Sequence, residues 1–396
     1  MKPLSTVASA VAPSSTLAID ALFKQMKADG IDVVGFGAGE PDFPTPEHIK
    51  QAAVRAIAEN KTKYTAASGT IELKEAICRR MLADYGLHYD AANVFTSSGA
   101  KHVVYLALCA ILNPGDEVIL PAPFWVSYIE MVRLAGGVPV VVETTEEEHF
   151  KLSPEKLAGA ITDKTKCLML NNPSNPTGML YTEAELRALA DVCMKHDLYV
   201  IADEIYATLV YDGCKFTSFP TLGEDVKEHT ILINGVSKAY AMTGWRIGYA
   251  LANRDIAGIM GRFASHSTGS ASTISQWAAV AALDGPQDEV ESMRQAFEQR
   301  RNYLVERINA LSGVSCLKPQ GAFYVMMNVS GLYGRSFGGI TVTDGDSFAD
   351  AFLHTGLVAV VPGSGFWAPD YVRWSYATGM DTIEAGCDRL EKFLKG

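Results

Sequence analysis

The chain has 396 residues, and its 45 acidic against 34 basic side chains give a formal net charge of −11 at pH 7. This acidic balance argues against a nucleic-acid-binding surface. The longest unbroken apolar run covers residues 103–112, about half of what a membrane-spanning helix needs. We therefore expect neither a nucleic acid nor a membrane as partner.

The seven cysteines stand singly, none in a C-x-x-C pair, and the eight histidines form no ligand cluster. This predicts no structural metal and no disulfide framework. Serines and a threonine interrupt the first dozen residues, so the apolar stretch of an export signal is missing. We expect a reducing, cytoplasmic location.

The middle of the chain alternates between helical and strand-like patterns. Apolar spacing predicts three helices: one over residues 101–112, one from after the turn at 121–123 to about 135, and one over 183–196. Between and after them lie the predicted strands 117–120, 138–142, 167–170, 199–202 and 230–233. Short buried strands separated by helices of about a dozen residues indicate an α/β fold with a mostly parallel sheet covered on both faces.

Near residues 285–286 this alternation stops. A long polar helix follows at 287–311, then a strand-like segment at 321–327, a glycine-rich stretch at 331–339 and a closing helix from about 382. We predict a large domain over residues 46–289 and a smaller α+β domain over 290–396. The segment 1–45 is predicted to pack with the small domain or a neighbouring subunit, and the charged run 143–148 to form a solvated loop.

Four segments carry residues suited to catalysis or ligand binding. The first covers residues 237–250, reads SKAYAMTGWRIGYA and contains Lys238. A lone lysine after a strand is more often a solvated charge. Such a lysine also forms a Schiff base with a carbonyl when its surroundings lower its pKa. Arg246, eight positions later, stands where it could meet an anion held by the same loop.

Asp203 ends a buried strand in the second segment, residues 199–206. The carboxyl ends of parallel strands are where α/β sheets bind ligands, and a buried acid there needs a cation or a hydrogen-bond donor. Tyr206 is placed to bond the same ligand. The alternative is a surface acid at a strand end.

The third and fourth segments are loops. Residues 171–178, NNPSNPTG, offer Asn175 as a positioned donor, or form a plain Asn- and Pro-rich turn. Residues 96–101, TSSGAK, start a helix and form either a phosphate cradle or a simple N-cap; the Walker A pattern is absent.

Taken together and in this order, the segments resemble the fold-type I aminotransferases, in particular the bacterial class I subgroup that contains aspartate aminotransferase. The motifs are GEPDF at 39–43, NPTG at 175–178, DEIY at 203–206 and SKAYAMTGWRIGY from 237. The resemblance covers nearly the whole chain. It implies a large domain with a mostly parallel seven-stranded sheet, a smaller α+β domain, pyridoxal 5′-phosphate as cofactor, and a homodimer.

The resemblance also assigns roles. Lys238 would form the Schiff base with the cofactor and move the substrate proton, Asp203 would pair with the pyridinium nitrogen, and Tyr206 and Asn175 would bond the ring oxygen O3′. Trp125 would stack on the ring. The phosphate would be held by Gly99, Ala100, Lys101, Ser237 and Arg246, with Tyr64 from a partner subunit.

On the substrate side, the resemblance implies that Arg373 grips the α-carboxylate in a bidentate fork, with Gly39, Trp125 and Asn175 beside it. Lys101 stands where aspartate-specific members hold the distal carboxylate. This favours aspartate or glutamate as amino donor and 2-oxoglutarate or oxaloacetate as acceptor.

One departure weakens a strict preference for aspartate. Residues 10–12, Ala-Val-Ala, precede Pro13 where related members carry basic side chains, which also makes prephenate a less favoured substrate. The alternatives are an aromatic or broad-specificity aminotransferase, or a carbon–sulfur lyase on the same fold. The lyase needs the same Lys238 and Asp203, so these residues do not discriminate between the reactions.

Overall fold

A seven-stranded sheet dominates the computed structural model, which describes residues 2–12 and 15–395. Pro13 lies outside the described residues. The strand order is β2 (Val94–Ser97), β8 (Gly248–Leu251), β7 (Thr230–Gly235), β6 (Tyr199–Asp203), β5 (Thr165–Asn171), β3 (Glu117–Ala122) and β4 (Val138–Glu143). Strand β8 runs in the opposite direction to the other six strands of this sheet. The mostly parallel sheet expected from the sequence is confirmed.

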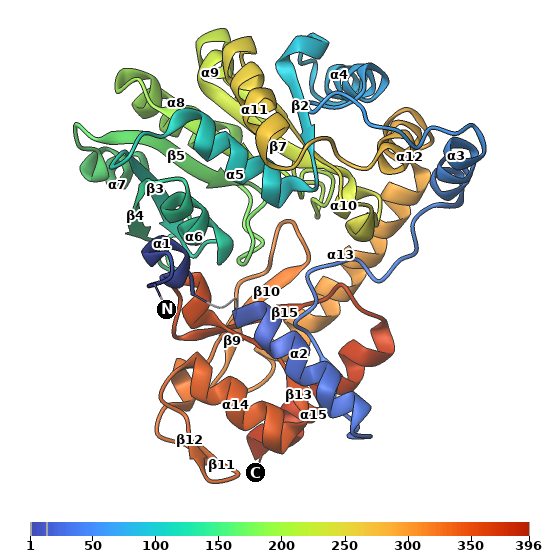
Figure 1. The fold of residues 1–396 in the computed structure, drawn as a ribbon. Helices are drawn as coiled ribbons and strands as arrows, with labels where there is room; N and C mark the ends of the chain where they lie inside the picture. The colour runs from blue at the N-terminus through green and yellow to red at the C-terminus, as the bar shows by residue number, and fades with distance from the viewer. Residues whose placement is uncertain (1, 13–14, 396) are drawn as a thin grey trace.

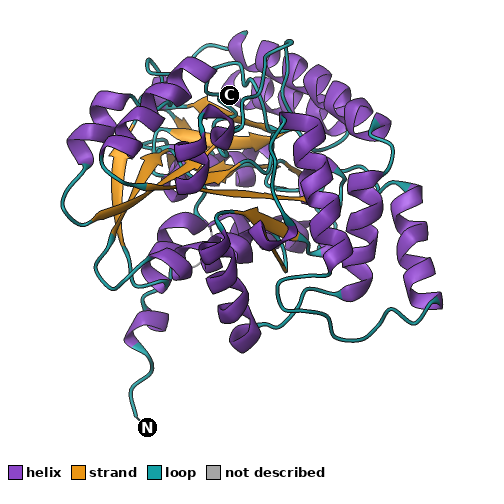
Figure 2. Cartoon of the chain, turned by 90° about the horizontal axis from the view of Figure 1, so that it is seen from above, coloured by secondary structure: helices purple, strands orange, loops and turns teal. Residues whose placement is uncertain are grey.

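Both faces of this sheet are covered by helices (Figure 2). In β6, Val200 and Ala202 pack with one apolar cluster and Ile201 packs with another. Because successive strand residues point to opposite faces, both sets must be apolar, which explains the unbroken hydrophobic runs of these strands.

The helices divide between the two faces according to the apolar clusters that they share with the strands. One face carries α5 (Ala100–Ile111), α6 (Ser127–Leu134) and α11 (Arg254–Ser267). The other carries α3 (Glu47–Ala58), α4 (Ile71–Tyr85), α7 (Pro154–Ala160), α8 (Glu183–Lys195), α9 (Glu224–His229) and α12 (Thr273–Asp284).

A second, four-stranded antiparallel sheet lies in the lower half of Figure 1. Its order is β14 (Val361–Pro362), β15 (Tyr371–Ser375), β10 (Tyr324–Asn328) and β9 (Ser315–Cys316). The helices of this part of the chain are α13 (Asp288–Asn309), α14 (Gly345–Gly356) and α15 (Met380–Lys395). Their apolar side chains share one core cluster with the sheet.

The N-terminal segment joins this second part through a short parallel pair, β1 (Val34–Gly35) with β13 (Val358–Ala359). Helix α2 (Ser15–Ala28) precedes it, and α1 (Thr6–Ser9) has no buried residue and leads away from the body (Figure 2). The pairing supports the predicted packing of residues 1–45; the domain boundaries stay a prediction. Across the described ranges, no helix is long and apolar enough to cross a bilayer.

Two local expectations differ from the structure. Strand β10 begins at Tyr324, three residues later than predicted, because Ala322 has a positive φ of 58° and the chain turns there. The loop at residues 143–148 is not simply solvated, since Glu146 accepts hydrogen bonds from Asn328 and Tyr371 of the small sheet. The glycine-rich stretch contains the hairpin β11 (Ser336–Phe337) and β12 (Ile340–Thr341).

Candidate active site

Polar side chains gather where parallel strands β5, β6 and β7 end. Asn171 ends β5 opposite Asp203, the last residue of β6, and donates from Nδ2 to its carbonyl oxygen over 2.8 Å. The same Asn171 accepts from the backbone N–H of Asn175 at 2.7 Å. Because carboxyl ends of parallel strands meet at one edge, three predicted segments converge on one place.

Asp203 is buried to 4% exposure. Its carboxylate accepts from the Tyr128 hydroxyl at 2.5 Å and from the Ile205 backbone N–H at 3.3 Å. Burial raises the pKa of Asp203 to about 6, while these two donors and the charge of Lys238 oppose the rise. A carboxylate held this way suits a cationic ring nitrogen.

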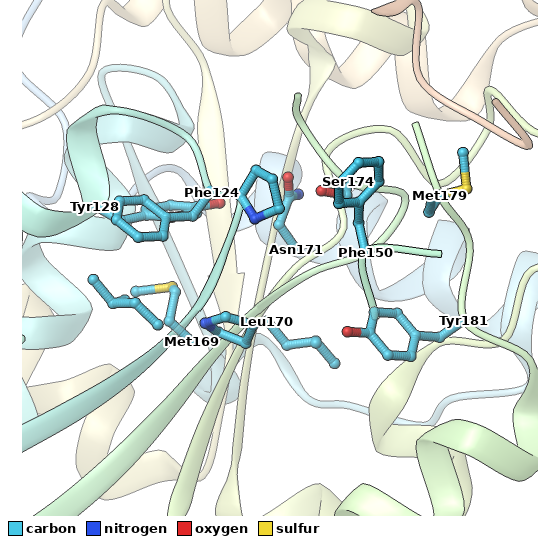
Figure 3. Close-up of a pocket in the computed structure, with 12 residues that line it drawn as sticks. Phe124, Tyr128, Phe150, Met169, Leu170, Asn171, Ser174, Met179 and Tyr181 are labelled. Carbon is cyan, nitrogen blue, oxygen red and sulfur yellow. The ribbon is translucent and has the colours of Figure 1, made fainter. Parts of the chain in front are cut away.

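Tyr128 was not among the predicted site residues. It lies three positions after Trp125 at the start of α6, and the two rings meet edge to face at 5.3 Å. The i, i+3 spacing from Trp125 was the available signal; the contact with Asp203, 75 positions away, was not readable. Tyr128 also lines, with Asn171 and Ser174, a cavity of about 20 Å³ at the ends of β3 and β5 (Figure 3).

Lys238 lies on the short helix α10 (Val236–Ala239), directly after β7. Burial lowers the pKa of its amine to about 8; Arg246 and Arg373 lower it further, and Glu40 and Asp203 act in the opposite sense. The amine donates to the carbonyl oxygen of Gly39. A lysine with this pKa is partly neutral near pH 8, as a Schiff-base nucleophile must be.

An anion cradle forms at the start of α5. The helix begins at Ala100 without a side-chain cap, so its first backbone N–H groups remain available. Gly99 has φ 86°, and a Cβ built on it would lie 2.4 Å from Nη2 of Arg246. The Arg246 guanidinium bonds the carbonyl oxygens of Thr243 and Ser98. Only glycine lets this arginine approach the helix start.

Positive charge concentrates around this cradle. Burial lowers the pKa of Lys101, and the nearby Arg246 lowers it further. The ammonium of Lys101 lies 4.9 Å from the centre of the Trp125 ring. In a chain of net charge −11, cations that repel one another at a helix N-terminus fit a phosphorylated ligand.

Arg373 supplies a second anion position. Its guanidinium is buried to 2% exposure and donates to Asn175 Oδ1 at 3.0 Å and to the Gly37 carbonyl at 3.1 Å. Within the described residues no carboxylate pairs with it, and its Nε has no partner. Burial lowers its pKa. An uncompensated buried guanidinium fits a ligand carboxylate.

The structure therefore brings together residues from most of the predicted segments. Tyr206 and Ser237 are buried there, while Gly39, Lys101 and Arg246 form an exposed rim. Tyr64 is different: its side chain is fully exposed, and no hydrogen bond connects it to the other predicted residues in the part of the chain that the structure describes.

Comparison with known proteins agrees with this geometry. The family model for aminotransferase class I and II matches residues 31–390. The chain belongs to this family. Its members depend on pyridoxal 5′-phosphate, which is therefore the cofactor of this chain. The chain is an aminotransferase of the class that the sequence motifs indicated.

Relatives of this aminotransferase cover its whole length. Aspartate aminotransferase of Geobacillus stearothermophilus is 50% identical over 395 residues, 100% of this chain and 99% of the relative. Aspartate/prephenate aminotransferase of Cereibacter sphaeroides is 47% identical, with 99% of each chain covered. The structure of aspartate aminotransferase from Thermus thermophilus with maleate matches with a TM-score of 0.94 at 42% identity, covering 100% of both chains.

Proposed function

We propose that this aminotransferase moves the amino group of aspartate or glutamate to 2-oxoglutarate or oxaloacetate by a ping-pong mechanism. The observation that carries the proposal is Arg373, a buried guanidinium whose hydrogen bonds within residues 2–12 and 15–395 go to the neutral oxygens of Asn175 and Gly37. A planar guanidinium binds a carboxylate with two parallel hydrogen bonds, so this site suits the α-carboxylate that every amino-acid substrate carries.

The cofactor, when bound, supplies an electron sink for negative charge that develops at the substrate Cα. Lys238 would be the covalent attachment point, and its amine would move a proton between the substrate Cα and the cofactor carbon C4′. Its lowered pKa, about 8, matches a group that must both accept and release a proton near neutrality.

Asp203 would hold the ring nitrogen in its protonated form, and the hydroxyl of Tyr206 and the amide of Asn175 would donate to the ring oxygen. Trp125 stacks on the ring face. The phosphate is bound by the cradle residues, namely Gly99, Ala100, Lys101, Ser237 and Arg246. Together these contacts would hold the cofactor in one orientation beside Lys238 and Arg373.

Lys101 is the residue proposed to select an acidic side chain. Its exposed ammonium lies over Trp125 at the rim of the site, within the positive field that attracts a second carboxylate. An acidic substrate is supported by full-length relatives named as aspartate aminotransferases and by a relative structure containing maleate, a dicarboxylate. Gly39 leaves space beside the α-carboxylate.

We also propose a homodimer located in the cytoplasm. The side chain of Tyr64 is fully exposed, and those of Leu4 and Val7 are largely exposed. A second copy that covers these groups would bring Tyr64 to the phosphate of its neighbour. The predicted division into residues 1–45, 46–289 and 290–396 belongs to this proposal, with the site between the two larger parts.

A half-reaction measured by absorbance tests the function. The loaded protein is mixed separately with L-aspartate, L-glutamate, L-phenylalanine, L-alanine and L-cystathionine, and conversion of the cofactor to its amine form is followed. Conversion by aspartate and glutamate, reversed by 2-oxoglutarate, is the expected result. Conversion by aromatic or small donors alone would reject Lys101 as selector. Pyruvate and ammonia from cystathionine, with no conversion, would identify a lyase.

A further inference from the structure

Tyr324 lies between two residues of the proposed site, although neither sequence motifs nor the proposed function assigns it a role. It belongs to β10 and is 1% exposed. Its hydroxyl is 3.1 Å from the hydroxyl of Tyr206, and its ring centre is 4.3 Å from Cζ of Arg373. One side chain thus contacts both the proposed ring-oxygen donor and the proposed carboxylate-binding arginine.

Strand register fixes the contact with Arg373. Tyr324 pairs with Ser375 and Arg373 pairs with Met326 across the antiparallel strands β10 and β15. Tyr324 and Arg373 are therefore diagonal neighbours on one face of the small sheet, a separation that aromatic and long side chains bridge. The ring of Phe366, 4.9 Å from Cζ, gives the guanidinium a second aromatic contact.

These rings matter because Arg373 has no carboxylate partner within the described residues. A desolvated cation above an aromatic face is attracted by the ring quadrupole. The ring of Tyr324 therefore helps to keep Arg373 charged and in place without occupying the hydrogen-bonding edge that a substrate carboxylate needs. A carboxylate in the same place would compete with that substrate.

The hydroxyl pair follows a simple donor count. Tyr206 and Tyr324 carry one O–H each, and only one is used between them. When Tyr206 donates to the ring oxygen of the cofactor, the bond within the pair must come from Tyr324. A hydroxyl that accepts a hydrogen bond becomes a stronger donor, so Tyr324 strengthens the donation of Tyr206.

Tyr324 also lies against the substrate segment. A Cβ built on Gly39 would be 3.4 Å from the Tyr324 hydroxyl. The tyrosine thus supports three parts of the site that come from distant positions in the chain. None of these contacts places it on the reacting atoms, so its role is one of positioning.

We propose that Tyr324 is a positioning residue with two separable actions: its hydroxyl sets the donor strength of Tyr206, and its ring holds the guanidinium of Arg373 for the substrate carboxylate. The proposal rests on the roles given to Tyr206 and Arg373 in the proposed function.

The test separates the two actions with Tyr324→Phe and Tyr324→Leu in the loaded enzyme. Two quantities are measured: the pH midpoint of the cofactor absorbance, and the Kd of maleate from the absorbance change on binding. Tyr324→Phe should raise the midpoint by about half to one pH unit, the size of one neutral hydrogen bond, and leave the maleate Kd within about twofold. Tyr324→Leu should raise the midpoint and also weaken maleate about fivefold or more.

A double variant shows whether the hydroxyl acts through Tyr206. Tyr206→Phe should raise the midpoint, and adding Tyr324→Phe should raise it no further, because coupled residues are not additive. The matched control is Tyr376→Phe. Tyr376 is another fully buried tyrosine, whose hydroxyl bonds the Ala322 carbonyl at 3.2 Å, and its loss should lower the thermal midpoint of unfolding without moving either readout.

An unchanged midpoint in Tyr324→Phe, beside a shifted one in Tyr206→Phe, would overturn the hydroxyl action and leave the proposed function intact. An unshifted Tyr206→Phe would contradict the role of Tyr206 itself. Equal maleate binding in wild type and Tyr324→Leu would overturn the ring action; if Tyr324→Leu does not fold, Tyr324→Met replaces it. Failure of wild type to convert any amino donor would reject the function independently of both readouts.

Discussion

The hydroxyl of Tyr128 donates to Oδ2 of Asp203 over 2.5 Å, deep in the interior and 75 positions apart in the chain. The bond favours the ionised form and so opposes the effect of burial, which raises the pKa of Asp203, and the balance of these effects is a pKa of about 6. Tyr128 thus supports the charge that the proposed mechanism requires of Asp203 at neutral pH.

Tyr128→Phe should therefore raise the pKa of Asp203. A hydrogen bond to a charged group stabilises it by about 1.5–3 kcal/mol, so we expect the acidic limb of the kcat/KM profile to move up by about one to two pH units. The profile is measured between pH 5 and 9. Tyr333→Phe, a change at a tyrosine that bonds Asp370 outside the site, should leave it unchanged. An unmoved acidic limb in Tyr128→Phe would show that this hydroxyl does not control Asp203.

Lys238→Ala should remove the visible absorbance of the bound cofactor while the protein stays folded. In wild-type apoprotein, the rate at which this absorbance develops on adding pyridoxal phosphate should rise with pH and level off above about 8, because only the neutral amine is a nucleophile and burial lowers its pKa to about 8. Rapid-mixing absorbance measures both effects. Lys164→Ala, a change at an exposed lysine outside the site, should keep the absorbance, whereas a chromophore surviving in Lys238→Ala would place the attachment elsewhere.

Arg373→Lys should weaken all amino-acid substrates to a similar degree. The substitution keeps one charge but loses the fork that binds both carboxylate oxygens, and we expect kcat/KM to fall ~10-fold or more for aspartate and for alanine. Lys101→Ala is the comparison, with a larger loss for dicarboxylic than for monocarboxylic substrates. Steady-state kinetics with both donors distinguishes the patterns, and a loss limited to aspartate in Arg373→Lys would assign the arginine to the distal carboxylate instead.

Glu204, the buried neighbour of Asp203, predicts a pH dependence of stability. It accepts hydrogen bonds from Ser218 Oγ and the Phe219 N–H at 2.7 and 2.8 Å, yet burial raises its pKa to about 8 from the ordinary 4.5 of a glutamate. A carboxyl that binds its proton more tightly when folded contributes stability below pH 4.5, and this contribution is lost as pH rises through 8.

Glu204→Gln keeps the size of the side chain and, like protonated Glu204, offers one acceptor oxygen to the Phe219 N–H and one donor to Ser218 Oγ, but it cannot ionise. Between pH 5 and 8, the free energy of unfolding of wild type should fall relative to that of Glu204→Gln, as measured by urea unfolding at fixed protein concentration. Glu155→Gln, at an exposed position of α7, controls for loss of surface charge. Parallel pH curves for wild type and Glu204→Gln would mean that the buried carboxyl ionises without cost.

The accuracy of the sequence predictions followed local signals. Helix α8 was predicted over residues 183–196 and covers Glu183–Lys195, so its start is correct and its end differs by one residue. A capping box between Thr182 and Glu185 marks the start. The start of β10 was missed because the positive φ of Ala322 is imposed by tertiary contacts of the turn. The local sequence pattern indicates helix caps and hydrophobic periodicity, but it does not indicate how one part of the chain packs against another.

The same distinction holds in the site. Lys238, Asp203 and Arg246 stand in motifs with recognisable composition, and the strand ends place them together. Tyr128 and Tyr324 resemble ordinary core aromatics in the sequence, and their importance comes from a partner 75 and 118 positions away. The contact of Tyr128 depends on how α6 packs against the seven-stranded sheet, and that of Tyr324 on how β10 lies near the end of β6.

The proposed site combines buried residues at its base with solvent-exposed residues at its edge. Tyr206 and Tyr324 are members of the same apolar cluster that holds the small sheet together, whereas Lys101, Gly39 and Arg246 face solvent. A substitution at Tyr206 or Tyr324 alters both the packing of the core and the catalytic groups, while a substitution at the exposed Lys101 leaves the apolar core intact. Substrate specificity can therefore change during evolution through substitutions at the exposed edge of the site, while the buried residues at its base stay the same.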